Sequence, residues 1–484
     1  MSAKEQILSK VLWSAVERFS VQGIQFILTL VIARILLPSD YGLVAMLTIF
    51  MVLSQVIVDS GFASALIQKK DRTDIDYSTA FYFNAIGSLI IYACLFLSAP
   101  FIASFFNEPQ LNSITKVFGL NVIIMSMGIV QQAKLMIELD FKRQAIASLI
   151  AVISSGTLGL WLAFHNYGVW TLVYQSLANN FVRVLMQWIF SRWLPSFCFS
   201  FQSFRSLFGF GSKLMLSVLL HQFYTNLYSL VIGKFFLASD LGYFNRAYTI
   251  AQFPSSNLSN ILMKVMYPIQ CRYQDDMEQL RSIFMKYMRI SIYAVFPLMI
   301  MLVALAEPLV HLILTDKWLP AVPYLRILCI AFMWDPIMRI NSTILNVKGR
   351  TDYFLKAEVI KKAVAIILLV ISVPFGVTAM CYSLLLYSMA DIVIIIYFSR
   401  RVTQIGYGKQ LTELSPIVGL NALMGICLYL VTLLPLSAWG KLLLGVPSGV
   451  IIYLAVSCVF HMSEWQMLLS VLKKSRGRSS QPSE

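Results

Sequence analysis

The sequence predicts an all-α integral membrane protein, and composition, the length of its apolar runs and the placement of its charges all support this. Of the 484 residues, 58% are hydrophobic and only 13% are charged, and the mean hydropathy is +0.74. A soluble chain carries about a quarter charged residues to cover its surface. The composition therefore excludes a soluble enzyme and a disordered protein.

Apolar runs long enough to cross a bilayer, roughly 20 residues each, predict about fourteen transmembrane helices. The first run contains Glu17 and Arg18 and is too long for a cleaved signal peptide, so we interpret it as a retained helix. The runs 208–235 and 240–268 are the most polar. In chain order the runs are 11–36, 41–65, 79–106, 113–137, 146–164, 168–190, 208–235, 240–268, 284–314, 320–346, 354–373, 376–399, 412–434 and 439–462.

The net charge of +15 follows the predicted topology. Connections after even-numbered runs carry lysine and arginine, as at Lys69, Lys70 and Arg72, whereas those after odd-numbered runs contain one such residue, Lys317. Because lysine and arginine remain on the cytoplasmic side, both termini are predicted to be cytoplasmic. Topology explains the basic excess, so nucleic acid is not an expected partner.

An internal repeat relates two parts of the chain. Residues 30–42 read LVIARILLPSDYG and residues 230–242 read LVIGKFFLASDLG, with seven of thirteen positions identical. The copies begin in the first and seventh runs and therefore have the same orientation. Parallel repeats of this kind place a substrate site between two halves, and a duplicated scaffold without a transport role is the alternative. Ser39 and Ser239 are expected to cap the helices that follow. The predicted domains are a six-helix lobe at 1–200, a second six-helix lobe at 201–405, and two additional helices with a basic tail at 406–484.

Polar side chains recur at helical spacing inside the predicted helices. In the first run they lie on one helix face, and the seventh run carries a comparable set. Uncompensated charge is costly in hydrocarbon, so such residues face a bundle interior or water. The doubled stripe favours a shared substrate cavity, and hydrogen bonding between helices of one lobe is the alternative. The candidate cavity residues are Arg18, Gln22, Gln25, Thr29, His221, Gln222, Asn226, Arg183, Arg246 and Arg326.

Three acidic residues, Glu17, Asp335 and Asp391, are candidates for ion coupling. Asp335 and Arg339 are four residues apart, so mutual neutralisation is the alternative for this pair. Structural ion pairs and snorkelling are the alternatives for the arginines. The cysteines form no Cys-x-x-Cys pair and the histidines no cluster, so no metal or cofactor is expected. No catalytic motif and only short connections are present, which argues against an enzyme.

Several longer strings resemble one family in combination. They are ERFSVQGIQFILTLVIARILLPSDYGLVAM, VDSGFASALIQKKDRTDIDYSTAF, LDFKRQAIASLIAVISSGTLGLWLAFHNYGVWTLVYQSL, FGFGSKLMLSVLL and LVIGKFFLASDLGYFNRAYTIAQFP. The chain thereby resembles the bacterial polysaccharide transporter family, in particular exporters of the colanic-acid type, over at least residues 10–290. The family belongs to the multidrug/oligosaccharidyl-lipid/polysaccharide flippase superfamily. The resemblance implies two six-helix lobes in a V around a central cavity lined by the first and seventh helices, with the last two helices outside.

The resemblance also implies a function. The expected activity is alternating-access flipping of an undecaprenyl-diphosphate-linked oligosaccharide from the cytoplasmic to the periplasmic leaflet of the bacterial inner membrane, for capsule, exopolysaccharide or O-antigen. Membrane lipid, a polysaccharide polymerase and the assembly machinery are the expected partners. Arginine suits a diphosphate because its fork donates two hydrogen bonds at once. The alternatives are a cation-coupled multidrug antiporter on the same scaffold, using Asp59, Asp335 or Asp391, and a membrane glycosyltransferase or polymerase, which the short connections oppose.

Overall fold

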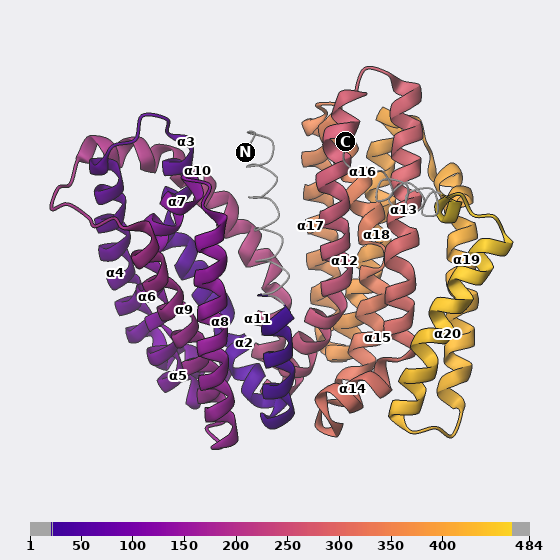
Figure 1. Ribbon diagram of the computed structural model, residues 1–484, viewed down its shortest axis with the longest axis horizontal. Coiled ribbons are helices and arrows are strands. Elements are labelled where there is room, and N and C mark those ends of the chain that lie inside the picture. Colours follow the sequence, from indigo (N-terminus) through magenta and orange to yellow (C-terminus); the bar gives the residue numbers. More distant parts are fainter. Residues whose placement is uncertain (1–20, 22, 467–484) are drawn as a thin grey trace, which may run out of the picture. The chain divides into compact units, whose positions relative to one another are not determined.

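The computed structural model describes Val21 and residues 23–466, and every regular element in this part of the chain is helical (Figure 1). Nine helical segments among these residues are long and apolar enough to cross a membrane. The prediction of a multi-pass, all-helical membrane protein is confirmed. The nine segments are Pro38–Gln68, Asp74–Phe106, Gln110–Ile137, Phe141–Phe164, Met277–Ala304, Ala321–Val347, Val377–Thr403, Tyr407–Leu433 and Ala438–Val459.

Further helices coincide with predicted runs but are shorter or less apolar than these nine. A short apolar helix, Gly23–Ile35, covers the end of the first run. The others are α9 (Val169–Ser191), α10 (Phe201–Thr225), α12 (Ala238–Arg272) and α17 (Thr351–Ser372). Polar and charged side chains interrupt the apolar surface of these four helices. In a membrane protein such helices must turn those side chains toward other protein or water.

The chain divides into two compact units, the first ending at Gly242 and the second beginning at Tyr243. In the first unit α8 and α9 pack side by side, α4 packs against α5 and α6, and α10 contacts α2, α3 and α4. A core of Phe62, Phe81, Val130, Trp193 and Leu207 joins α3, α4, α7 and α10. The helices of this unit not yet bounded are α2 (Pro38–Asp59), α3 (Phe62–Gln68), α4 (Asp74–Phe106), α5 (Gln110–Phe118), α6 (Leu120–Ser126), α7 (Ile129–Ile137), α8 (Phe141–Phe164) and α11 (Leu227–Phe235).

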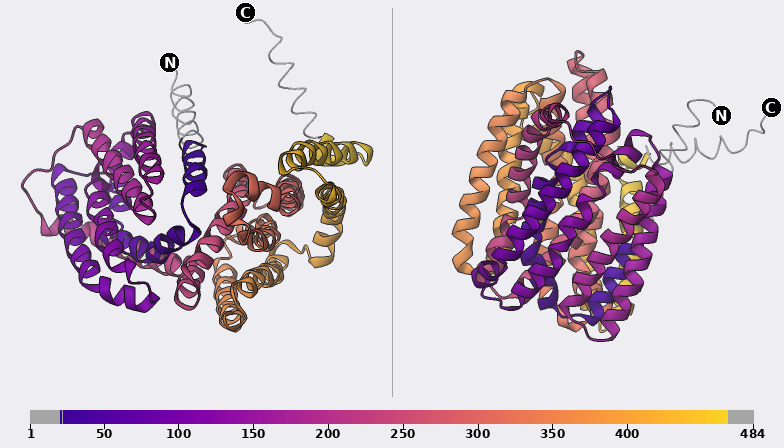
Figure 2. Two further views of the ribbon diagram at one scale, coloured as in Figure 1. Left: turned by 90° about the horizontal axis from the view of Figure 1, so that it is seen from below. Right: turned by 90° about the vertical axis from the view of Figure 1, so that its left-hand side faces the viewer.

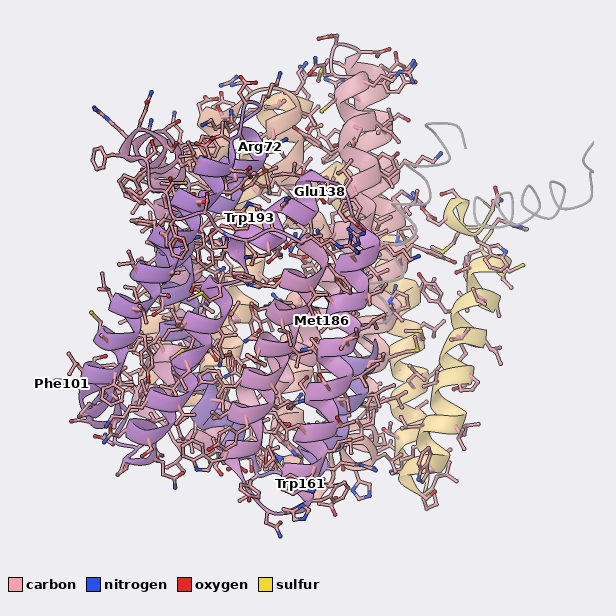
Figure 3. All side chains as sticks on the ribbon, turned by 60° about the vertical axis from the view of Figure 1, so that its left-hand side comes forward. Arg72, Phe101, Glu138, Trp161, Met186 and Trp193 are labelled. Atoms are coloured by element: carbon pink, nitrogen blue, oxygen red, sulfur yellow. The ribbon has the colours of Figure 1, made fainter. Side chains whose placement is uncertain are left out.

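The two ends of the first unit carry different side chains. Arg72, Glu138 and Trp193 lie at one end and Trp161 at the other (Figure 3). Trp161 is half exposed beside the ring of His165, as is typical of aromatic residues at a membrane–water interface. Between the ends, apolar side chains such as Phe101 on α4 are largely exposed, as expected for a surface that faces lipid.

The two copies of the repeat contact each other within the first unit. A Cβ atom on Gly42 would lie 1.7 Å from the carbonyl oxygen of Ala238, and one on Gly242 would lie 2.0 Å from the carbonyl oxygen of Pro38. Each glycine therefore admits the backbone of the other copy, and the contact is reciprocal. No other residue type fits at these two positions without displacing one of the helices.

The prediction that Ser39 and Ser239 cap these helices is wrong. The helices begin at Pro38 and Ala238, which puts both serines inside the first turn. The backbone N–H of Leu37 instead donates to Asp40 Oδ2 at 2.9 Å, and that of Leu237 donates to Asp240 Oδ2 at 3.4 Å. In each copy the aspartate accepts the hydrogen bond of the N-cap backbone N–H, as the acidic residue of a capping box does.

In the second unit α17 and α18 pack side by side, and α18 also contacts α15 and α16. Helix α13 contacts α15, α16 and α19, while α20 packs on α19 and α14. Figure 2 shows α19 and α20 side by side at one edge of this unit. The bounds are α13 (Met277–Ala304), α14 (Ala306–Leu314), η1 (Asp316–Trp318), α15 (Ala321–Phe332), α16 (Asp335–Val347), η2 (Val373–Phe375), α18 (Val377–Thr403), α19 (Tyr407–Leu433) and α20 (Ala438–Val459).

Candidate functional site

The polar stripe predicted for the first run lies partly outside the described residues. Glu17, Arg18 and Gln22 fall there. Of the others, Gln25 is exposed and Thr29 is half-buried on the helix Gly23–Ile35. The stripe therefore stays a prediction.

The stripe predicted for the seventh run lies at a break between two helices. Helix α10 ends at Thr225, α11 begins at Leu227, and Asn226 between them leaves the helical conformation. Asn226 Nδ2 donates to the carbonyl oxygen of Gln222 at 2.9 Å, and the Thr225 hydroxyl donates to the same oxygen at 3.1 Å. His221, one residue before Gln222, is exposed. The break thus gathers His221, Gln222 and Asn226 within about one helical turn.

Arg183 on α9 belongs to a chain of polar side chains inside the first unit. Its Nη2 donates to Asn180 Oδ1 at 3.1 Å, and Asn180 Nδ2 donates to Asn121 Oδ1 on α6 at 2.7 Å. The half-buried guanidinium forms no ion pair within the described part of the chain. A cation in a membrane helix is normally paired. Sequence reasoning singled out Arg183 but missed Asn121 and Asn180. The available signal for these two was that each is a polar residue inside an apolar run.

The other two candidate arginines have neighbours inside the second unit. Arg246 on α12 is 9% exposed, and its guanidinium lies over the ring of Trp318, 5.4 Å from the centroid. Arg326 on α15 pairs with Glu307 on α14, with 3.5 Å between Nη2 and Oε2. The Arg326–Glu307 pair matches the ion-pair alternative for that residue, whereas Arg246 lies against an aromatic ring.

The acidic candidates of the second unit are paired with basic side chains. Asp335 and Arg339 form the ion pair that their spacing predicts, at 2.6 Å. Asp391 on α18 lies 3.3 Å from the Nζ of Lys361 on α17, which also binds Glu358 at 2.5 Å. The side chains of Lys361 and Asp391 are almost fully buried. Asp391 therefore shares Lys361 with Glu358, and sequence reasoning missed this partner.

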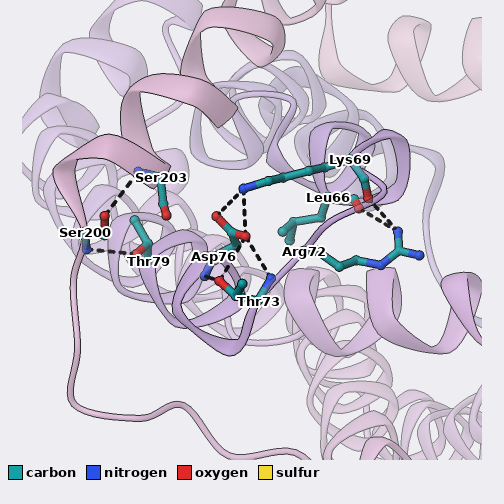
Figure 4. A network of polar contacts seen from close by, with 8 residues as sticks. All are labelled: Leu66, Lys69, Arg72, Thr73, Asp76, Thr79, Ser200 and Ser203. Atoms are coloured by element: carbon teal, nitrogen blue, oxygen red, sulfur yellow. Dashed lines mark hydrogen bonds and ion pairs between the residues drawn. The ribbon is translucent and has the colours of Figure 1, made fainter.

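A second ion pair, in which only the carboxylate is buried, closes the α3–α4 connection of the first unit (Figure 4). Lys69 Nζ binds the two carboxylate oxygens of Asp76 at 2.7 and 2.8 Å, and the Thr73 backbone N–H donates to Asp76 Oδ2 at 2.8 Å. One turn along α4, Thr79 Oγ1 accepts from the backbone N–H of Ser200, the residue before α10. These contacts attach the start of α10 to the first turns of α4.

The chemistry available among these residues is binding rather than catalysis. The described residues contain no group of three or more His, Cys, Asp or Glu side chains that could hold a metal ion. The neutral amide partner of Arg183 leaves the guanidinium with donors for an anion. The asparagine and glutamine side chains on α9 and α10 offer both donors and acceptors, as hydroxyl-rich ligands require.

Comparison with known proteins identifies relatives along most of the chain. Residues 31–323 match a family described as polysaccharide biosynthesis protein. The teichuronic acid biosynthesis protein TuaB of Bacillus subtilis is 26% identical, over 72% of this chain and 73% of the relative. The lipopolysaccharide biosynthesis protein WzxC of Escherichia coli is 27% identical, over 75% of this chain and 74% of the relative.

Solved structures show a similar fold. The lipid II flippase MurJ in its inward closed conformation superposes with a TM-score of 0.76 at 14% identity, covering 93% of this chain and 99% of the other. An inward-facing multidrug resistance transporter of the MATE family superposes with a TM-score of 0.62 at 15% identity, covering 81% and 98%. Identities this low are evidence for the fold alone.

Proposed function

Because this chain belongs to the family of polysaccharide biosynthesis proteins, we propose that it is a flippase for a lipid-linked oligosaccharide that is a precursor of a surface polysaccharide. Beyond family membership, the proposal rests on the surroundings of Arg183. It is a guanidinium inside a membrane-embedded unit, held by the neutral side chain of Asn180 and forming no ion pair among the described residues. An anionic ligand supplies the missing charge.

A diphosphate that joins a lipid to a sugar has the chemistry that Arg183 recognises. Guanidinium and phosphate form two parallel hydrogen bonds, and these bonds are strengthened where water is excluded. The amides of Gln222 and Asn226 have the chemistry to bind sugar hydroxyls. The lipid tail needs no polar partner and stays in the bilayer. An undecaprenyl-diphosphate-linked repeat unit, the substrate that the family resemblance implies, has this chemistry.

The finer architecture belongs to the same proposal. In this proposal the protein has about fourteen spanning helices, arranged as two six-helix lobes with two additional helices at the C-terminal end. Both termini are cytoplasmic in the bacterial inner membrane, and transport runs by alternating access toward the periplasm. A polysaccharide polymerase and its assembly machinery then receive the flipped unit.

The antiporter alternative has weaker support. A fold shared with MATE transporters says nothing about the cargo. A cavity for cationic drugs requires acidic side chains. Two of the three candidates, Asp335 and Asp391, are paired with Arg339 and Lys361, which leaves Asp59 as the one acidic candidate without an ion pair among the described residues.

Deletion of the gene tests the proposed function. In a strain without a second exporter, we expect loss of the surface polysaccharide and accumulation of its lipid-linked precursor, measured by mass spectrometry of the lipid extract. Restoring the wild-type gene removes the accumulated precursor. Normal surface polysaccharide with no accumulated precursor in the deletion strain rules the proposal out.

Arg183→Gln is expected to lower export about tenfold or more at unchanged protein level, because a charge-assisted hydrogen bond contributes about 1.5–3 kcal/mol. Arg183→Lys keeps the charge but loses the paired donors, so intermediate export is expected. The matched control is Arg205→Gln, at an exposed position of α10, which should export normally. Export and precursor level are measured in the complemented deletion strain, and equal export by Arg183→Gln and wild type contradicts the assignment.

A further inference from the structure

Three arginines and three tyrosines stack alternately at one end of the second unit. They come from the connection before α17, the first turn of α17, the last two turns of α18 and the start of α19. In order of contact they are Arg350, Tyr353, Arg401, Tyr397, Arg400 and Tyr407. Together these six residues form an arginine–tyrosine ladder. None of them belongs to the candidate substrate residues described above.

Each guanidinium of the ladder lies over a tyrosine ring. The guanidinium carbon of Arg350 is 3.8 Å from the centroid of the Tyr353 ring. That of Arg401 is 4.5 Å from the centroid of Tyr397 and 5.9 Å from that of Tyr353, and Arg401 also donates a hydrogen bond to the Tyr397 hydroxyl. Arg400 lies 5.0 Å from the Tyr397 centroid. Attraction between a cation and the face of an aromatic ring therefore orders all three guanidinium groups.

The tyrosine rings are themselves held by the second unit. Tyr407 Oη donates to the carbonyl oxygen of Val393 on α18 at 2.7 Å, and the Arg400 guanidinium lies 5.5 Å from the Tyr407 centroid. The Tyr353 ring lies 5.8 Å from that of Phe398, which is buried in a core shared by α16, α17 and α18. The ladder is therefore an ordered surface that connects α17, α18 and α19.

The ladder carries more positive charge than the described acidic residues neutralise. Asp352 binds Arg350, with 2.9 Å between Oδ1 and Nε. Arg400 and Arg401 are exposed and form no ion pair with any described residue. Stacking occupies the face of a guanidinium and leaves the N–H groups at its edge available to an acceptor. Two such donors match two oxygens of a phosphate group.

Exposed apolar side chains lie one helical turn from the ladder. Val393 precedes Tyr397 by four residues on α18, and Leu411 follows Tyr407 by four residues on α19, so each lies on the same helix face as a ladder ring. Their side chains are 56% and 70% exposed. Both turns lead into segments long and apolar enough to cross a membrane. Tyrosine is enriched at such boundaries, because its ring is apolar and its hydroxyl group is polar.

We propose that the ladder binds the headgroup of an anionic phospholipid, whose acyl chains lie along the exposed apolar faces of α18 and α19. Basic sites between spanning helices have the chemistry to bind such headgroups. A zwitterionic phospholipid also has a phosphate group, but it brings its own positive charge beside three arginines. A free phosphate ion makes the same hydrogen bonds and has no chains for the apolar faces. A bound headgroup stabilises the packing of the helix ends that the ladder connects.

Lipid titration of the purified full chain in detergent micelles tests the proposal. Dimyristoyl phosphatidylglycerol and dimyristoyl phosphatidylcholine, which share their acyl chains, are added separately, and bound lipid is counted by native mass spectrometry. We expect phosphatidylglycerol to bind roughly tenfold more tightly. Hydrogen–deuterium exchange in nanodiscs then locates the site. Phosphatidylglycerol in place of phosphatidylcholine should slow exchange several-fold in residues 350–357 and 397–411, and less elsewhere. Inorganic phosphate added to phosphatidylcholine nanodiscs should not slow it.

Three variants distinguish an ordered site from diffuse attraction by surface charge. The double variant Arg400→Gln with Arg401→Gln should bind phosphatidylglycerol roughly tenfold more weakly or worse. Changing the same two residues to lysine keeps the charge but loses the stacked forks, so binding should weaken several-fold. Tyr397→Leu removes no charge but takes away the ring under both guanidiniums, and it should weaken binding to a similar extent. The matched control removes two exposed arginines outside the ladder, Arg205→Gln with Arg272→Gln, and should bind as the wild type does.

Each outcome decides the question. Selective binding of phosphatidylglycerol that the ladder variants weaken and the control does not supports the proposal. Equal binding of the two lipids overturns it, and so does wild-type binding by the lysine variant or an equal loss in the control. Equal protection by inorganic phosphate assigns the site to a soluble anion instead. If Tyr397→Leu fails to fold in phosphatidylcholine, the lysine variant decides alone. None of these measurements uses an oligosaccharide, so they succeed or fail independently of the proposed transport function.

Discussion

Gly42→Ala is expected to destabilise the first unit by about 1–3 kcal/mol, although alanine in a helix interior normally stabilises by up to about 1 kcal/mol. The added methyl group would lie 1.7 Å from the carbonyl oxygen of Ala238. That oxygen belongs to backbone, so it cannot turn aside as a flexible side chain would. The start of α12 must move away from α2, and the reciprocal contact at Gly242 opens with it. Thermal unfolding of the purified protein measures the loss.

The double variant and a matched control make this prediction specific. Once Gly42→Ala has separated the two copies of the repeat, the close contact at Gly242 is already open, so Gly242→Ala adds a smaller loss of stability. The double variant should therefore cost less than the sum of the singles. Gly87→Ala on α4 meets no atom within 4 Å and should leave the melting temperature unchanged or slightly higher. A melting temperature of Gly42→Ala equal to that of Gly87→Ala would refute the close contact.

The spanning helices were predictable, because a run of apolar residues determines a membrane helix locally. The repeat was also visible, and its shared glycine was a usable signal for the close contact between the copies. The helix starts were misread because serine at a helix start normally caps. Here α2 begins at Pro38, one residue before Ser39. The side chain of Asp40, one residue after Ser39, accepts a hydrogen bond from the backbone N–H of the N-cap residue.

The partners of the polar residues were not predictable in the same way. Asp391 and Lys361 lie on different helices, and only the packing of α17 against α18 shows that they meet. The same is true of Asn180 and Asn121, which lie on α9 and α6. Sequence periodicity identifies the face on which a side chain lies, but it does not identify the helix that this face meets. Arg183 was identifiable as a candidate, whereas its lack of a counter-charge among the described residues required the structure.

Lys69→Met is expected to destabilise the first unit by about 1–3 kcal/mol, because the buried carboxylate of Asp76 loses its cation and keeps only the hydrogen bonds from Thr73. Asp76 is 1% exposed, and its two oxygens accept from Lys69 at 2.7 and 2.8 Å. Asp76→Asn should cost less, because the lysine that remains is 30% exposed and reaches water. Chemical unfolding of the purified variants measures both values.

Removing both charges together distinguishes this explanation from a loss of packing. The double variant Lys69→Met with Asp76→Asn should recover part of the stability that Lys69→Met loses, because no buried charge then remains unpaired. If instead the double variant is as unstable as the sum of the singles, the two residues act independently. The pair also lies beside the Thr79–Ser200 hydrogen bond that attaches α10 to α4. Faster hydrogen exchange at the start of α10 is therefore expected in Lys69→Met, and it should return toward the wild-type rate in the double variant.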